Sequence, residues 1–180
     1  MHEKLYDGGV ERLRTPERVA RLEVERVVAL CLEAVDIKSV LDVGVGSGLF
    51  AEAFVQYGLE VAGVDVNPDM IVAAKQFVPK GDFRESTAEA LPYPVASFDL
   101  VFFGLLLHES DEPLKVLQEA RRVSHQRVGI LEWSYQVSEF GPPLAHRMNP
   151  IEITNLTRQA GFTSLENIPL THLSFYRLTV

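Results

Sequence analysis

Three glycines at alternating positions, with an acidic residue about 20 positions further on, are the residues of this 180-residue chain whose spacing suggests a ligand site. Gly44, Gly46 and Gly48 follow the apolar run 40–43, and Asp65 ends the next apolar run. Glycines at a strand-to-helix turn let the backbone approach a ligand closely, and an acid at this distance can accept hydrogen bonds from a ribose hydroxyl pair. The pattern predicts a site for a small charged cofactor that contains ribose.

The form of the glycine turn separates the cofactors that such a site could take. A dinucleotide fingerprint reads G-x-G-x-x-G, and a phosphate-binding P-loop reads G-x-x-x-x-G-K-[ST]. This chain instead reads Asp42-x-Gly44-x-Gly46-x-Gly48, and the helical pattern that follows contains no lysine to grip phosphates. The motif resembles the first motif of the class I S-adenosylmethionine-dependent methyltransferases, which begins with an acidic residue two positions before such a turn.

The resemblance extends beyond the glycine turn. Asn67-Pro68-Asp69-Met70 continues Asp65 as the ribose motif of the family does, and residues 86–94 are similar to the adenine loop of the family. The family usually carries Asp where this chain has Thr87, so either the Thr87 hydroxyl or Glu89 would contact the adenine amino group. The cofactor-binding residues that the resemblance implies are Asp42, Gly44, Val45, Gly46, Gly48, Asp65, Val66, Met70, Thr87, Ala88, Glu89 and Gly104.

Within that class the chain resembles the small methyltransferases related to ubiquinone and menaquinone biosynthesis, and three short segments strengthen the likeness: Glu132-Trp133, Gly141-Pro142-Pro143 and His146-Arg147. The resemblance implies an enzyme that uses S-adenosyl-L-methionine, releases S-adenosyl-L-homocysteine and methylates a small-molecule acceptor by direct in-line transfer. Two alternatives stay open, a non-catalytic protein that binds or senses S-adenosylmethionine and an NAD-dependent Rossmann oxidoreductase. Turnover would exclude the first alternative, and cofactor choice would exclude the second.

Side chains that follow the fourth and fifth predicted strands are the candidates for contact with the methyl acceptor, because ligands of doubly wound sheets bind outside the carboxyl ends of the strands. His108 follows the fourth strand, where the resemblance places the reactive methyl group, and could act as a general base or simply line the pocket. Trp133 and Tyr135 follow the fifth strand and could form an aromatic wall or pack in the core. His146 and Arg147 could hold an anionic group of the acceptor, cap the next helix or form a salt bridge to Glu152.

Composition indicates a soluble globular protein without a polyanionic partner. Hydrophobic residues make up 47% of the chain and charged residues 23%, with a net charge of -8 that argues against nucleic-acid binding. Arginines between positions 12 and 26 alternate with glutamates, which is typical of a solvated helix face with i,i+4 ion pairs. No apolar run reaches the roughly 20 residues of a membrane span, and residues 1–5 start no secretory signal, so a cytoplasmic location is expected. One cysteine and the histidine spacing predict neither a disulfide nor a metal site.

Apolar strand patterns alternate with amphipathic helix patterns along the chain. Strands are expected at about residues 39–43, 61–65, 82–85, 100–103, 127–132, 163–168 and 172–180. Helices are expected at about residues 15–34, 49–57, 68–78, 112–123 and 150–160. Such alternation favours right-handed β-α-β units, while the short link between the last two strands requires an antiparallel hairpin.

The predicted fold is therefore α/β, a single three-layer Rossmann-like domain over residues 1–180. Its seven-stranded sheet is mostly parallel with an antiparallel last strand, as the methyltransferase resemblance also implies. An N-terminal helical segment, residues 1–36, is expected to cover the sheet or the pocket. Because no insertion of cap size lies between the strands, the pocket is open, built by this segment, or completed by the second subunit of a homodimer.

Overall fold

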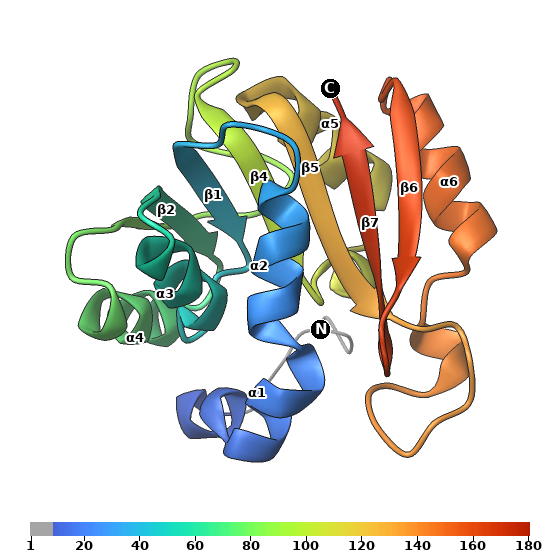
Figure 1. Cartoon of the computed structure of the whole chain (residues 1–180), viewed down its shortest axis with the longest axis horizontal. Coiled ribbons are helices and arrows are strands. Elements are labelled where there is room, and N and C mark those ends of the chain that lie inside the picture. Colours follow the sequence, from blue (N-terminus) through green and yellow to red (C-terminus); the bar gives the residue numbers. More distant parts are fainter. Residues whose placement is uncertain (1–8) are drawn as a thin grey trace.

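A seven-stranded sheet forms the centre of the structure, a computed structural model that describes residues 9–180. The strands are β1 (Ser39–Val43), β2 (Glu60–Asp65), β3 (Asp82–Glu85), β4 (Phe98–Gly104), β5 (Ser124–Trp133), β6 (Ser164–Pro169) and β7 (Leu173–Thr179). They lie in the order β3-β2-β1-β4-β5-β7-β6, and only β7 runs antiparallel to its neighbours (Figure 1). The predicted α/β fold with a reversed last strand is confirmed. The prediction about a secretory signal concerns residues 1–5, which lie outside the described part.

Helices cover both faces of the sheet. The helical elements are η1 (Val10–Arg14), α1 (Pro16–Leu22), α2 (Val24–Leu32), α3 (Leu49–Gln56), α4 (Pro68–Phe77), η2 (Leu107–Glu109), α5 (Pro113–Val123), η3 (Leu144–His146) and α6 (Pro150–Gln159). Helices α2, α3 and α4 share one apolar core, and α5 and α6 share the other. Figure 1 shows α2 and α3 in front of the sheet and α5 behind it, which is the predicted three-layer arrangement. Within residues 9–180, no helix combines the length and apolar character needed to cross a membrane.

The two central strands, β1 and β4, are apolar along most of their length because helices cover both of their faces. Side chains alternate between the faces, so Val40 and Phe102 belong to the core of α2 and α3, while Leu41 and Phe103 belong to the core of α5. All four side chains are fully buried. The strand order reverses between β1 and β4, which predicts a binding crevice at the carboxyl ends of these two strands.

The prediction of one continuous helix over residues 15–34 is wrong, because Glu23 divides it into α1 and α2. Glu23 has φ 48° and ψ 44°, in the left-handed region that non-glycine residues seldom adopt. Its carboxylate accepts a hydrogen bond from the N–H of Thr171 at 2.8 Å and pairs with Arg26 at 2.7 Å. The break allows α2 to pack on the sheet while α1 lies at the carboxyl edge of the strands (Figure 1).

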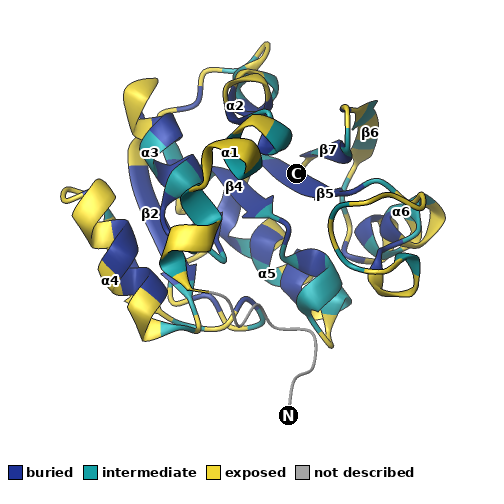
Figure 2. Ribbon diagram, turned by 90° about the horizontal axis from the view of Figure 1, so that it is seen from below, coloured by how far each residue is buried: buried dark blue, intermediate teal, exposed yellow. Residues whose placement is uncertain are grey.

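The segment formed by η1 and α1 is attached to the sheet layer through Arg14. Its guanidinium donates to the carbonyl of Ser47 at 3.0 and 3.2 Å and to the carboxylate of Glu52 at 2.7 Å, and it lies 3.3 Å above the ring of Phe77. Arg14 therefore departs from the predicted solvated helix face, since its partners come from α3, α4 and the turn before α3. Seen from the carboxyl edge, α1 lies near the centre of the molecule (Figure 2).

Candidate active site

A pocket of about 1000 Å³ lies at the carboxyl ends of β1, β2, β4 and β5. This is the crevice expected where the strand order reverses, and its volume is at the upper end of the range for small-molecule sites. Leu13 and Arg18, from the N-terminal segment, contribute to its wall. The predicted site residues that line it are Gly44, Gly46, Asp65, Val66, Met70, Thr87, Ala88, Glu89, Gly104, His108, Trp133 and His146.

The glycine turn uses backbone conformations that L side chains rarely adopt. The φ values are 71° at Gly44, 53° at Gly46 and 76° at Gly48. A Cβ atom at Gly44 would collide with the side chain of Leu106, and one at Gly48 would lie 3.0 Å from the Cα of Ala74 in α4. The turn thus needs glycine both for its conformation and for its close packing, and it leaves bare backbone on the pocket wall.

Asp65 braces the glycine turn and faces the pocket at the same time. One carboxylate oxygen accepts from the N–H of Gly46 and the other from the N–H of Asn67, both at 2.9 Å. Burial raises the pKa of Asp65, and these backbone hydrogen bonds oppose the rise. A carboxylate can accept about four hydrogen bonds, so lone pairs remain for a vicinal diol in the pocket. The geometry fits a ribose, which is the group predicted for Asp65.

Three of the predicted cofactor-binding residues, Asp42, Val45 and Gly48, lie behind the turn and do not line the pocket. Asp42 is 2% exposed on β1, where burial and the nearby charge of Asp65 raise the pKa of Asp42 to about 8. Val45 is buried in the core of α2 and α3, and Gly48 is the N-cap of α3. The buried side chains of Asp42 and Val45 and the N-cap position of Gly48 support the turn from inside the fold.

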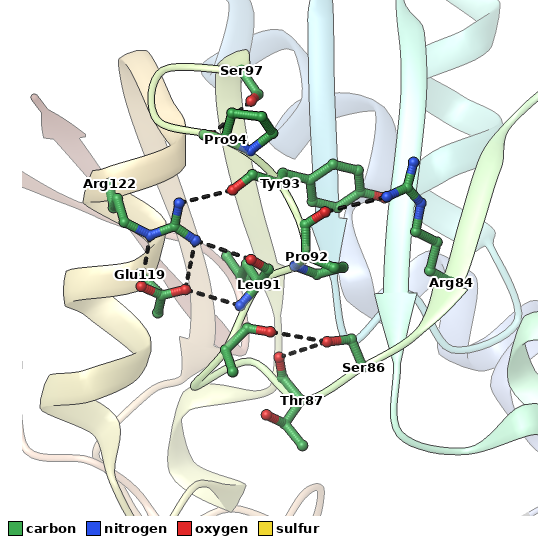
Figure 3. A network of polar contacts seen from close by, with 11 residues as sticks. Arg84, Ser86, Thr87, Leu91, Pro92, Tyr93, Pro94, Ser97, Glu119 and Arg122 are labelled. Carbon is green, nitrogen blue, oxygen red and sulfur yellow. Dashed lines mark hydrogen bonds and ion pairs between the residues drawn. The ribbon is translucent and has the colours of Figure 1, made fainter.

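The loop between β3 and β4, residues 86–97, is held by a network of hydrogen bonds (Figure 3). From α5, Arg122 donates to the carbonyls of Leu91 at 2.9 Å and Tyr93 at 2.7 Å. Glu119 accepts from the N–H of Leu91 at 2.9 Å and pairs with Arg122 at 2.7 Å. Helix α5 therefore positions the wall that the resemblance assigns to adenine.

Thr87 and Glu89, the alternatives for the adenine contact, both line the pocket from this loop. The carboxylate of Glu89 also accepts from the hydroxyl of Ser110 at 2.7 Å. Ser110 directly follows η2, so this hydrogen bond joins the adenine loop to the segment that carries His108. Both alternatives remain available to a ligand at this end of the pocket.

His108 lies in η2, just past the end of β4, and is paired with an acid that the sequence had not assigned to the site. Its Nδ1 lies 2.8 Å from Oε2 of Glu132, and its backbone N–H donates to Oε1 of the same carboxylate at 3.1 Å. The two side chains are 8% and 1% exposed. Glu132 lies at the end of the apolar run of β5, where an unpaired charge is costly. A glutamate at such a position was the feature of the sequence that could have identified Glu132 as a site residue.

The loop of residues 134–148 contributes Gly141, Pro142 and His146 to the pocket wall, and Arg147 organises it. Arg147 is 6% exposed. Its guanidinium donates only to groups of this loop, namely the carbonyls of Ser134, Gln136, Phe140 and Pro142 and the hydroxyl of Ser138. A guanidinium has five N–H donors, and these bonds use all five. The predicted contact of Arg147 with an anionic acceptor is therefore replaced by a role in folding the loop.

Trp133 connects this loop to the pocket. Gly141 packs against it with φ 79°, and a Cβ at Gly141 would lie 2.5 Å from the indole ring. Trp133, Gly141, Pro142 and His146 all line the pocket. Tyr135, which was predicted to contact the acceptor, is 45% exposed and lies outside the lining, because β5 ends at Trp133 and Tyr135 faces solvent.

A protein-family model described as "Methyltransferase domain" matches residues 41–128. The match contains the glycine turn, Asp65, the loop 86–97 and His108, and it ends before Glu132. The demethylmenaquinone methyltransferase of Renibacterium salmoninarum is 33% identical over 117 residues, which cover 65% of this chain and 49% of that protein. The chain thus spans about half the length of that relative.

Solved structures show the same fold over nearly the whole chain. A SAM-dependent methyltransferase from Aquifex aeolicus has a TM-score of 0.83 at 23% identity, and the alignment covers 95% of this chain and 96% of that one. Phosphoethanolamine N-methyltransferase 2 from Haemonchus contortus, solved in complex with S-adenosyl-L-methionine, has a TM-score of 0.72 at 16% identity. That alignment covers 87% of this chain and 52% of the Haemonchus contortus chain. Residues 41–128, which include the glycine turn and Asp65, are thus similar to a methyltransferase domain and to a demethylmenaquinone methyltransferase, and the chain has the fold of solved S-adenosylmethionine-dependent methyltransferases.

Proposed function

We propose that this protein transfers the methyl group of S-adenosylmethionine to a small-molecule acceptor. The observation that carries the proposal is a single pocket in which the glycine turn, Asp65 and His108 all line the wall. The name of the Renibacterium salmoninarum relative favours a small molecule as acceptor. A volume of about 1000 Å³ is large enough for a nucleoside cofactor together with such a molecule.

The cofactor would occupy the half of the pocket made by the glycine turn, β2 and the loop 86–97. Gly44 and Gly46 would admit it close to the backbone, and Asp65 would accept hydrogen bonds from the ribose hydroxyls. Thr87 or Glu89 would contact the adenine amino group. When bound, the cofactor supplies a methyl group that is already activated by a positively charged sulfur.

The acceptor would occupy the other half, between His108, Trp133, Gly141 and His146. These residues exclude water and orient the nucleophilic atom of the acceptor. Orientation of this kind is worth up to roughly 7 to 11 kcal/mol in well-aligned reactions, so the protein needs little further chemistry. The acceptor half is therefore where substrate choice would be made.

Ligand binding followed by an acceptor screen tests the proposal. S-adenosylmethionine at about 100 times its dissociation constant should stabilise the fold by about 2.7 kcal/mol, measured as a thermal shift. NAD should produce no comparable shift, because the turn lacks the dinucleotide spacing of glycines. An equal shift with NAD would contradict the proposal. Release of S-adenosylhomocysteine in the presence of acceptors would then exclude a protein that only binds or senses the cofactor.

Four further expectations stay predictions. They are that residues 1–180 form one domain, that the protein is cytoplasmic, that it binds no nucleic acid and that it forms a homodimer. Light scattering at several protein concentrations would decide the last of them.

A further inference from the structure

We propose that Glu132 is a positioning residue that holds the ring proton of His108 on Nδ1, so that Nε2 accepts a proton from the methyl acceptor. The inference rests on the proposed methyl transfer and narrows its substrate class, since the acceptor atom must carry a dissociable proton, as a hydroxyl or a phenol does. That atom loses its proton to Nε2 while its electron pair forms the bond to the methyl carbon. The electron pair of the broken carbon–sulfur bond stays on sulfur, and the imidazolium releases the proton to solvent.

The geometry around Glu132 determines which ring nitrogen carries the hydrogen. The carboxylate accepts from the backbone N–H of His108 at 3.1 Å and from that of Trp133 at 3.3 Å, and it lies 2.8 Å from Nδ1 of His108. An ionised carboxylate can only accept hydrogen bonds, so Nδ1 must be the donor in this pair. The neutral imidazole then has its lone pair on Nε2.

The second ring nitrogen, Nε2, lies near another carboxylate of the pocket wall. Nε2 of His108 lies 4.0 Å from Oε1 of Glu109, and both residues line the pocket wall. Nδ1 is therefore held by a buried acid, and Nε2 is the ring nitrogen that is left for a ligand in this pocket. An acid that fixes the tautomer and direction of a basic histidine is the arrangement that general-base catalysis requires.

Charged groups from three parts of the fold act on His108: Glu132 from β5, Glu109 from η2, and Arg147 from the loop 134–148. Burial is the largest influence and lowers the pKa of His108, and Arg147 also lowers it. The hydrogen bond and charge of Glu132, together with the charge of Glu109, outweigh both, so that the pKa of His108 is raised above its usual 6.5. The neutral base is then present above that raised pKa and is lost as the pH falls through it.

Imidazole ¹⁵N NMR of the ligand-free protein tests the proposal, because the ring shifts distinguish the two tautomers. Above the pKa of His108, the wild-type protein should carry the proton on Nδ1. Glu132→Gln should lower the pKa of His108 and populate the tautomer with the proton on Nε2, because the glutamine amide offers one acceptor oxygen and a competing donor. A wild-type ring protonated on Nε2, or a variant with unchanged pKa and tautomer, would overturn the proposal.

Glu109→Gln is the matched control, since it removes a carboxylate near Nε2 and leaves the Nδ1 hydrogen bond in place. It should lower the pKa of His108 without moving the proton from Nδ1. If Glu132→Gln does not fold, the tautomers of the wild type and of Glu109→Gln still decide the question. In the acceptor screen, product should form from hydroxyl-bearing compounds and not from tertiary amines. If the NMR shows the proton on Nε2, the role of Glu132 is rejected but the proposed methyl transfer is not. If the protein does not bind S-adenosylmethionine, the methyl transfer is rejected, while the tautomer measured by NMR still holds for the ligand-free protein.

Discussion

The two halves of the pocket are built from different parts of the polypeptide. The cofactor half depends on backbone groups: the carboxylate of Asp65 accepts from the N–H of Gly46 in the glycine turn and from that of Asn67, two positions away. The acceptor half depends on side chains from separate elements, with His108 paired to Glu132 across 24 positions. A site formed by backbone groups requires glycine at fixed positions, so it can be recognised as a motif in the sequence. A pair of side chains from separate elements has no such motif. Replacing a single residue of one half should consequently change either cofactor affinity or turnover of the acceptor, but not both.

The largest expected effect is on the acceptor half alone. Replacing His108 with Ala should reduce turnover by roughly 10²-fold or more, the usual contribution of a general acid or base, while cofactor affinity stays nearly unchanged. Isothermal titration with S-adenosylmethionine and initial rates with an acceptor found in the screen measure the two quantities separately. A parallel loss of cofactor affinity would place His108 in the cofactor half and would break the comparison.

The next effect concerns the cofactor half. Asp65→Ala removes a charged acceptor whose hydrogen bonds are worth about 1.5 to 3 kcal/mol each, so affinity for S-adenosylmethionine should fall at least about tenfold. Asp69→Ala is the matched control, because Asp69 is exposed in the same region and does not line the pocket. Equal affinities of the two variants would show that the carboxylate of Asp65 serves only to brace the turn.

A smaller effect is expected from Arg147→Lys. Lysine has three N–H donors and no planar fork, so at least two of the five acceptors in the loop 134–148 would lose their hydrogen bond to this side chain. Each lost hydrogen bond costs about 0.5 to 1.5 kcal/mol, and the free energy of unfolding should fall accordingly, with a higher KM for the acceptor. Arg121→Lys, which replaces a single hydrogen bond to the carbonyl of Gly161 at 2.9 Å, is the control. An equal fall in the free energy of unfolding of both variants would show that Arg147 does not organise the loop.

The smallest effect is expected at Tyr135, the residue that the sequence assigned to the acceptor and the structure leaves in solvent. Tyr135→Ala should change the free energy of unfolding by no more than about 0.5 kcal/mol, as for most exposed positions. Kinetics with the acceptor should also be unchanged. A marked rise in KM would show that the loop 134–148 turns Tyr135 inward when the acceptor binds.

The sequence predicted the parts of the fold that depend on short stretches of chain. The alternation of apolar and amphipathic segments located all seven strands to within a few residues, and Asn67 caps α4 as its sequence context indicates, with its side chain accepting from the N–H of Asp69. The same reasoning missed the break at Glu23. The left-handed conformation there accompanies a hydrogen bond from Thr171, 148 positions away, which no local pattern contains.

The amino-acid sequence alone predicted the glycine turn and Asp65, because a positive φ demands glycine at particular positions and an acid at this distance along the chain is the residue expected to accept from a ribose. Only the tertiary structure decided the acceptor half. Glu132 meets His108 because β4 and β5 are neighbours in the sheet, and Arg147 is enclosed by a loop whose carbonyls turn inward around it. Partners of this kind are chosen by the packing of separate elements, and a residue's type says what it can bond to but not which group it will meet.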